Sequence, residues 1–479
     1  MTPRTASRAA VLCAALALVA GCDSGEPDGR RGSASRAPDV VPTGSRPPAQ
    51  GKGSDDPADV NGDGHRDLVV QVPVGAPREQ PKETRLTVVF GSPRGPDPAT
   101  RTLYDRRDLG LPTLRTRPGG TPAPPPGDPT LADLDDDGFP DFVFREAVPV
   151  DAAGTPRAGS LGTRPVEYVA WGGPGGPRRG ARATELPLPP RDRPDGYEAP
   201  VMGDFDGDGR HDLAALREDG TALVIRYGPF TRAGVAARTE RRPPADPEAT
   251  WYSGLYADEV STSGRPRVTG LFVHHGTDGE QSDGVYYAPG KGGIAATGRP
   301  VRAGNAIAFG DFDGDGRRDL AVGDDGSRNN EPGATTEPPA VDGSYAVYAG
   351  DGSVRTHRLP ASHRGRFAAV DPDGDGRDGL LVARSDAAVL LDGSRVTGRL
   401  SRRPPARVDG RAIRGSDRLT RLHTVADFDG DHRDEIVLGW SSSTLLHRYG
   451  DTPIHWWVAD GMSREDDVAF ATRRFARPE

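Results

Sequence analysis

The chain has 479 residues, of which 64 are glycine and 47 are proline, and its formal net charge is −9 at neutral pH. So much glycine and proline leaves little room for long helices, and short strands are therefore expected to predominate. The acidic balance, without a basic stripe carrying interleaved aromatic residues, argues against a nucleic-acid partner.

The first 21 residues have the pattern of a signal peptide. Two arginines precede an apolar stretch at residues 9–20, which is too short to span a bilayer with its flanks. The stretch ends in "VAGC" at residues 19–22, which resembles a bacterial lipobox whose cysteine, here Cys22, becomes the diacylated N-terminus. We therefore expect a protein that is lipid-anchored to the outer face of the bacterial cytoplasmic membrane and touches the membrane through that lipid only. The alternative is an ordinary signal peptide with an incidental cysteine.

Residues 22–54 have the composition of a disordered tether. They consist mainly of glycine, serine, proline, arginine and aspartate. Such a segment has too few apolar side chains to order itself, and as a flexible coil it has an r.m.s. reach of roughly 30 Å. The folded part is expected to occupy residues 55–479.

A ten-residue motif rich in aspartate and glycine recurs in that part, with "DFDGDGRRDL" at residues 311–320 as an example. The six copies open at Asp59, Asp133, Asp204, Asp311, Asp371 and Asp427. Oxygens at positions 1, 3, 5 and 9 of a tight loop can converge on one point, while glycines at positions 4 and 6 permit turns with positive φ. Such an all-oxygen set suits Ca²⁺ better than Mg²⁺, which demands a near-ideal octahedron. Ordinary hairpin turns also use aspartate and glycine, but a turn does not need four carboxylates.

The expected ligands are side-chain oxygens at positions 1, 3, 5 and 9 and the backbone carbonyl at position 7. In five copies these residues are Asp59, Asn61, Asp63, His65 and Asp67; Asp133, Asp135, Asp137, Phe139 and Asp141; Asp204, Asp206, Asp208, Arg210 and Asp212; Asp311, Asp313, Asp315, Arg317 and Asp319; and Asp427, Asp429, Asp431, Arg433 and Glu435. The remaining copy offers Asp371, Asp373 and Asp375 but has Gly379 at position 9, with Asp378 beside it. The sequence thus predicts about five Ca²⁺ ions and one weak loop.

A second repeat fixes the number of structural units. Seven short runs of β-branched or aromatic residues end in a hairpin signal, at Pro93, Pro174, Pro229, Gly290, Gly350, Gly393 and Gly450. The unit without a recognisable motif lies between Asp204 and Asp311, where residues 257–273 keep the flanking strands but have lost the acids. With strands before and after each motif, every unit contains four strands. The predicted fold is therefore all-β, a seven-bladed β-propeller of four-stranded blades.

The motif D-x-[DN]-G-D-G-x-x-D-[LF] resembles the FG-GAP (VCBS-type) repeat of integrin α-chain N-terminal propellers. Phe309-Gly310 before one loop and Gly75-Ala76-Pro77 after another agree with that repeat. The resemblance covers about residues 55–479. It implies a seven-bladed propeller with calcium in the loops between the first and second strands of each blade, and it says little about the ligand.

No catalytic motif stands beside these repeats. The sequence has no G-x-S-x-G, H-E-x-x-H or glycine-rich phosphate loop. Neighbouring residues of a strand point to opposite faces, so His274 and His275 are not expected to share an ion. Trp456 and Trp457 are expected to serve in blade packing, and the alternative is a platform that binds a sugar.

These patterns predict a non-catalytic binding or adhesion module whose partner is a protein or a cell-wall or surface glycan. Its recognition residues are expected in long insertions at 145–165, 276–284 and 323–343. The alternative is a lipid-anchored extracytoplasmic hydrolase or lyase on a propeller scaffold.

Overall fold

The computed structural model describes residues 42, 44–74, 84–112, 126–150, 162–193, 195–243, 252–276, 281–328, 340–360, 363–384, 386–442, 445 and 452–476. All of them belong to one unit of the chain, residues 34–479. The predicted signal peptide and Cys22 lie outside the described residues. Within the described residues, no helix is long and apolar enough to cross a lipid bilayer.

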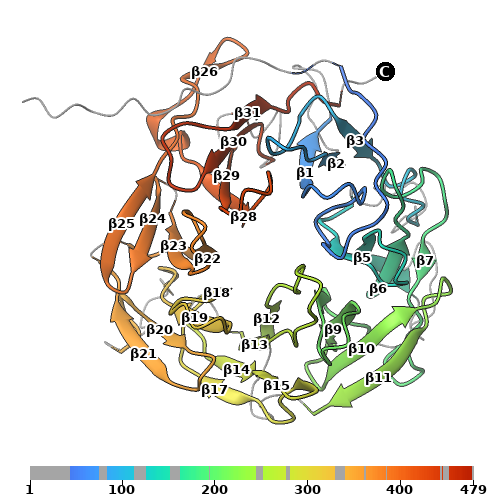
Figure 1. Cartoon of the computed structure of the whole chain (residues 1–479). Coiled ribbons are helices and arrows are strands. Elements are labelled where there is room, and N and C mark those ends of the chain that lie inside the picture. Colours follow the sequence, from blue (N-terminus) through green and yellow to red (C-terminus); the bar gives the residue numbers. More distant parts are fainter. Residues whose placement is uncertain are drawn as a thin grey trace, which may run out of the picture. The chain divides into compact units, whose positions relative to one another are not determined.

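Seven antiparallel sheets follow one another around a ring, and their colours run once from blue to red (Figure 1). The first blade has three strands, β1 (Leu68–Pro73), β2 (Thr84–Val89) and β3 (Arg101–Tyr104). The other six have four strands each: β4 (Thr130–Ala132), β5 (Asp141–Val150), β6 (Gly162–Ala170) and β7 (Thr184–Glu185); β8 (Val201–Gly203), β9 (Asp212–Leu216), β10 (Leu223–Phe230) and β11 (Ala236–Arg242); β12 (Tyr252–Ala257), β13 (Leu271–His275), β14 (Gly284–Tyr287) and β17 (Arg299–Val301); β18 (Ala306–Gly310), β19 (Asp319–Gly323), β20 (Ser344–Tyr348) and β21 (Val354–Arg358); β22 (Arg366–Val370), β23 (Gly379–Ala383), β24 (Ala388–Asp392) and β25 (Arg395–Leu400); and β28 (Arg421–Ala426), β29 (Glu435–Trp440), β30 (His455–Asp460) and β31 (Val468–Ala471). The predicted all-β, seven-bladed propeller is thus confirmed.

Within the described part of the chain, three short elements lie outside the blades. Two are hairpins, β15 (Pro289–Gly290) with β16 (Gly293–Ile294) and β26 (Arg407–Val408) with β27 (Arg411–Ala412). The third is the 3₁₀ helix η1 (Gly415–Asp417).

Blade one departs from the expected four strands because it has no strand before its motif. The preceding residues, 51–58, read "GKGSDDPA", with few apolar side chains and a proline that cannot donate to a ladder. Instead, Gly51 N–H donates to the Asn61 carbonyl at 3.0 Å and Ser54 N–H to the Gly138 carbonyl at 2.8 Å. Residues assigned to the tether thus contact blades one and two, and the described structure begins upstream of residue 55.

Blade seven takes its third strand from a later segment than the sequence predicts. The expected run, residues 445–450, lies outside the described residues apart from Leu445. The described third strand is β30, which pairs with β29 from Glu435↔Asp460 to Trp440↔His455. Trp456 and Trp457 of β30 are 1% and 0% exposed and belong to the core. Their predicted role in packing is confirmed.

The core lies mainly between neighbouring blades, since seven apolar clusters each join residues from two adjacent sheets. The first and last blades meet in one of these clusters, where Leu68, Val70 and Val72 of β1 pack with Trp456 and Phe470. A parallel bridge between Val74 and Ala476 adds a backbone contact. Among the described residues, side-chain packing and this one bridge, rather than a shared sheet, join the first and last blades.

The predicted recognition insertions are described only in part. Residues 145–150 and 162–165 extend β5 and β6, whose pairing continues to Val150↔Gly162. Part of the first insertion is therefore a longer hairpin. The segments 151–161, 277–280 and 329–339 lie outside the described residues.

Candidate metal centres

Each motif is a tight loop between two strands, or before β1 in blade one, with positive φ at positions 4 and 6. Glycine occupies most of these positions, as in Gly314 and Gly316 with φ of 75° and 79°. Two residues other than glycine take the same conformation, Asp136 with φ 62° and His432 with φ 72°. The turn geometry inferred from the glycines is present even where one glycine is missing.

The carboxylate at position 1 organises the loop from inside. Asp311 Oδ1 accepts the N–H groups of Gly314 and Asp315 at 2.8 and 3.1 Å, and its Oδ2 accepts that of Gly316 at 2.8 Å. The position-5 carboxylate accepts the N–H two residues later, from Arg317 to Asp315 at 2.8 Å. Equivalent contacts are made by Asp59 and Asp63, Asp133 and Asp137, Asp204 and Asp208, Asp371 and Asp375, and Asp427 and Asp431.

The position-9 carboxylate ties the loop to the third strand of the blade. Asp319 Oδ2 accepts the Phe312 N–H at 3.0 Å, and Oδ1 accepts the N–H of Gly350, just after β20, at 2.8 Å. Three other loops repeat both contacts, through Asp67 with Val60 and Gly91, Asp141 with Leu134 and Gly172, and Asp212 with Phe205 and Gly228. A Cβ at Gly350 would come within 2.6 Å of Arg317 Cβ. The glycine after the third strand and the position-9 acid of the motif are therefore structurally coupled.

Five loops bring three acids close enough to share an ion. Their carboxylate oxygens lie within 4.8 Å of one another in the groups Asp133, Asp135 and Asp141; Asp204, Asp206 and Asp212; Asp311, Asp313 and Asp315; Asp371, Asp373 and Asp375; and Asp427, Asp429 and Glu435. Position 9 belongs to three of these groups and position 5 to the other two. The loop at Asp59 has an amide, Asn61, at its third position.

The position-3 side chains supply the observation that tests whether a cation fits. Three of these carboxylates direct Oδ2 to an arginine, Asp135 to Arg232, Asp206 to Arg238 at 3.0 Å, and Asp313 to Arg355 at 3.3 Å. In each case the other oxygen, Oδ1, is buried and has no hydrogen-bond partner in the described structure. The same holds for Oδ1 of Asn61. A buried acceptor without a partner is costly. A hard cation held between positions 1, 3, 5 and 9 would satisfy all four oxygens.

Burial and mutual repulsion raise the pKa values of several acids in these loops. Burial is the main cause that raises the pKa of Asp141, Asp212 and Glu435 to about 8, and the neighbouring loop acids add to it. The same causes raise the pKa of Asp133 and Asp319 to about 6. Without a cation, several of these carboxyl groups hold protons near neutral pH, so a cation must compete with protons for them.

The sixth-blade loop lacks its closing ligand for a visible reason. A Cβ at Gly379 would lie 2.5 Å from Leu390 Cδ1, so a leucine fills the space beside position 9. The adjacent Asp378 does not replace the missing acid. Its Oδ2 accepts the Asp311 N–H of blade five at 2.6 Å, and its own N–H donates to the Asp311 carbonyl at 2.9 Å.

In several motifs the side chain at position 8 contacts the neighbouring blade. The sequence analysis did not predict this contact. Asp434 of blade seven accepts the Asp371 N–H at 2.7 Å, and His211 Nδ1 of blade three accepts the Asp133 N–H at 2.8 Å. Thr269 of blade four accepts the Asp204 N–H at 2.9 Å. The available signal was a polar residue directly before the closing position in several copies.

Blade four retains the first acid of the motif, which corrects the expectation that its acids were lost. Asp258 follows β12 directly, and its side chain is 0% exposed. Two arginines pair with it, Arg267 at 2.7 Å and Arg318, from the loop of blade five, at 2.9 Å. In blade four, guanidinium groups thus provide the positive charge that a bound cation would provide in the other loops.

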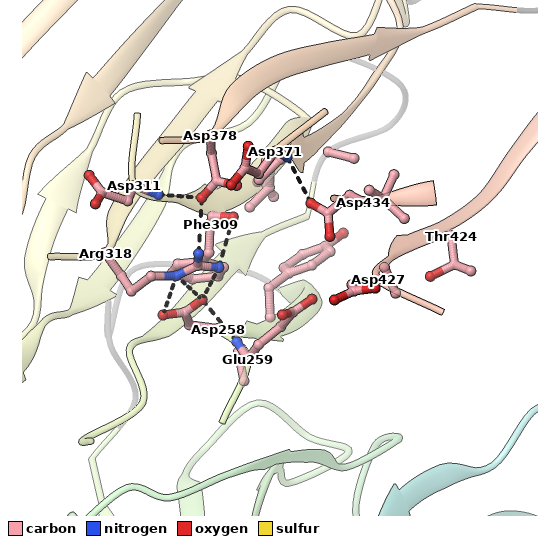
Figure 2. A pocket seen from close by; sticks show the side chains of 18 of the residues that line it. Asp258, Glu259, Phe309, Asp311, Arg318, Asp371, Asp378, Thr424, Asp427 and Asp434 are labelled. Carbon is pink, nitrogen blue, oxygen red and sulfur yellow. Dashed lines mark hydrogen bonds and ion pairs between the residues drawn. The ribbon is translucent and has the colours of Figure 1, made fainter. Parts of the chain in front are cut away.

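Four position-8 side chains, Arg66, Arg318, Asp378 and Asp434, line a cavity of about 910 Å³ inside the ring, to which all seven blades contribute residues (Figure 2). Arg318 bridges Asp258 and Asp378, while Glu259 and Asp434 face the same space. Burial raises the pKa of Asp434 to about 7, and Glu259 and Asp378 add to the shift. The acids that face this cavity include two, Asp378 and Asp434, that fasten neighbouring blades.

The two adjacent histidines have separate partners. His275 Nδ1 lies 2.7 Å from Asp283 Oδ1, and His274 Nε2 lies 3.2 Å from the Ser282 carbonyl. The two side chains point to opposite faces of β13, as the strand periodicity requires.

A family model for the FG-GAP repeat matches residues 303–349, which span β18 to β20 and the loop at Asp311. The chain therefore contains an FG-GAP repeat within a seven-bladed propeller. No curated protein matches the chain.

Several solved structures are similar at low identity. A chain in the structure of BBS1N in complex with ARL6DN is 12% identical, with 86% of this chain and 94% of that chain covered and a TM-score of 0.38. The Vibrio cholerae biofilm matrix protein Bap1 is 11% identical, with 83% and 88% covered and a TM-score of 0.30. Synechocystis apocarotenoid oxygenase is 12% identical, with 90% and 94% covered and a TM-score of 0.41. At these identities and TM-scores the similarity says nothing about ligand or activity.

Proposed function

We propose that this protein is a calcium-stabilised, non-catalytic propeller that binds a protein or glycan partner outside the cytoplasm. The observation that carries the metal assignment is the set of buried position-3 oxygens without a partner in the described loops. In three of these loops the second oxygen of the same carboxylate already pairs with an arginine, so only the inner oxygen is left to satisfy.

Five loops are proposed to hold Ca²⁺, those that open at Asp59, Asp133, Asp204, Asp311 and Asp427. Each has an acid at position 9 and oxygen-bearing side chains at positions 1, 3 and 5. The loop at Asp371 is proposed to bind weakly because Gly379 contributes no oxygen. Calcium would neutralise carboxylates that otherwise repel one another, and each filled extracellular-type site stabilises the fold by about 1.4 kcal/mol at ten times its dissociation constant.

The way in which the acids are engaged supports the proposal of a binding role rather than catalysis. The loop carboxylates accept backbone N–H groups. Asp378 and Asp434, which line the cavity, accept backbone N–H groups of the neighbouring blades. A carboxylate committed to backbone donors and a cation is a poor proton donor or base. Equilibrium binding of immobilised polysaccharides and secreted proteins, measured with calcium and with EDTA, tests this role. Binding to none of them, together with turnover of a polysaccharide or lipid substrate, would contradict it.

The anchor is a separate part of the proposal and rests on "VAGC" at residues 19–22. Replacing Cys22 by serine is expected to abolish lipidation and move the protein from the detergent phase to the aqueous phase. Unchanged partitioning in the variant would overturn the lipid anchor and leave the calcium sites unaffected.

A further inference from the structure

The link between blades six and seven is strongly basic. Residues 401–421, called here the arginine loop, contain seven arginines and two aspartates, without lysine or glutamate, in a chain whose net charge is −9. The loop runs from the end of β25 to the start of β28 and includes the hairpin of β26 and β27. Every residue of the loop is described.

The loop is built on a fixed frame. Its hairpin turns through Asp409 and Gly410, with φ of 48° and 79°, which suits the turn of a two-residue hairpin. Val408 and Ile413, at 2% and 8% exposed, are inserted into the core cluster that contains Trp440 and Trp457. The backbone between the arginines is thereby held against blade seven.

Polar contacts fix both ends of the loop. Arg402, with a side chain 1% exposed, pairs with Asp466 at 2.5 Å. Arg418 donates to the Pro404 carbonyl at 2.6 and 2.9 Å, and Trp440 Nε1 donates to the Asp417 carbonyl at 2.8 Å. Two of the seven arginines are therefore structural, and they close the frame.

The five other arginines of the loop are exposed to solvent: Arg403, Arg407, Arg411, Arg414 and, at the start of β28, Arg421. The two aspartates of the loop offset only part of this charge, because the exposed arginines outnumber them. Asp409 lies 3.8 Å from Arg473, and Asp417 lies 3.7 Å from Arg414, whose side chain is 75% exposed. The exposed face of the loop is thus positively charged.

We propose that the arginine loop binds an acidic polysaccharide through its carboxylate groups, an inference that rests on the proposed binding function and names its partner class and surface. Guanidinium groups form paired hydrogen bonds to planar carboxylates. Because the frame is already ordered, little conformational entropy is lost when the polymer binds. Repeated carboxylates along a glycan can engage several arginines at once.

Two other polyanions fit the loop less well. Nucleic-acid binding without sequence preference draws on aromatic side chains that stack with bases, but the loop contains none and the neighbouring Trp440 and Trp457 are 0% exposed. Insertion into an anionic membrane requires a broad apolar face. Within the loop, Leu419, at 40%, is the large apolar side chain exposed to solvent.

The test uses the full-length protein in calcium and three probes: a polyuronate, single-stranded DNA and vesicles containing anionic lipid, with an uncharged dextran as reference. One variant carries Arg403→Gln, Arg407→Gln, Arg411→Gln and Arg414→Gln. A control removes the same charge from exposed arginines elsewhere, through Arg94→Gln, Arg178→Gln, Arg191→Gln and Arg265→Gln.

The loop variant is expected to bind polyuronate at least about ten-fold more weakly, a change of about one unit in log Kd, while the control changes little. Both variants should keep the parent's calcium content and melting temperature. Equal losses in the two variants, or a loop variant that binds as tightly as the parent, would overturn the surface. Loop-dependent binding to DNA or vesicles that exceeds binding to polyuronate would overturn the partner class. Calcium content is measured on the same samples, so a failure of the metal sites is seen separately.

Discussion

Asp319 and Gly350 are 31 residues apart, yet the Gly350 N–H donates to Asp319 Oδ1 at 2.8 Å. The contact joins the closing acid of a candidate calcium loop to the end of the third strand of the same blade. The geometry at the loop and the packing of the blade are therefore coupled.

Replacing Gly350 by alanine is expected to lower both stability and calcium affinity in blade five. The new Cβ would lie 2.6 Å from Arg317 Cβ, so the backbone must move away from Asp319. Such overpacking costs about 1–3 kcal/mol of unfolding free energy. Gly175→Ala is the control, since a Cβ there meets no atom within 4 Å. Urea unfolding of the two variants checks the prediction, which equal midpoints would contradict.

Asp319→Ala and Asp378→Ala are expected to separate metal binding from blade fastening. The first variant should lose one calcium ion, because it removes the position-9 oxygen. The second should keep its calcium but lose about 1–3 kcal/mol, since the buried N–H of Asp311 loses its acceptor. Elemental analysis together with unfolding curves distinguishes the two. A lower ion count in Asp378→Ala would show that this acid is a ligand after all.

Arg318→Met is expected to destabilise the propeller strongly. Its guanidinium pairs with Asp258, whose side chain is 0% exposed, and with Asp378. Breaking a buried pair on one side typically costs about 3–5 kcal/mol, although Arg267 remains beside Asp258 and reduces the loss. Arg377→Met, which removes an exposed pair with Asp392, is the control and should change stability by less than about 1 kcal/mol. Similar thermal denaturation of both variants would refute the role given to Arg318.

The calcium-free protein is expected to lose stability as the pH rises from about 4 to about 8. Burial raises the pKa of Asp141 and Asp212 from 3.8 to about 8 in the folded state, so the unfolded chain releases these protons first. A raised folded pKa stabilises the fold below the unfolded value, and this contribution is lost as the pH passes through the folded value. Saturating calcium should remove the loss, because a cation favours the ionised form. Melting temperatures between pH 5 and pH 8.5, with EDTA and with calcium, check the sign. A calcium-free protein that gains stability over this range would contradict it.

Much of this architecture was predictable because each blade repeats the same local chemistry. The glycines of the loops predicted backbone conformations with positive φ. The spacing of the carboxylates predicted that their oxygens converge on one point. The hidden fourth blade followed from the doubled spacing between Asp204 and Asp311. Its surviving acid, Asp258, was missed because Val260, Thr262 and Pro266 stand at positions 3, 5 and 9, where most other copies carry acids or an amide.

Contacts between blades were the part that sequence reasoning did not reach. Asp378 beside Gly379 looked like a displaced ligand, and only the position of Asp311 across the blade boundary shows its use. The third strand of blade seven was predicted at the wrong segment for a different reason. Two apolar segments of the sequence could supply its third strand, and the described structure places Trp456 and Trp457 in that strand, at 1% and 0% exposed.

The central claim is that calcium occupies the aspartate loops and stabilises the propeller. Its most direct test is the number of calcium ions bound by the purified full-length protein after equilibrium dialysis, together with its melting temperature before and after EDTA. The account predicts about five ions per chain and a melting temperature that falls by several degrees when they are removed. A protein that retains no calcium and melts at the same temperature in calcium and in EDTA would contradict it.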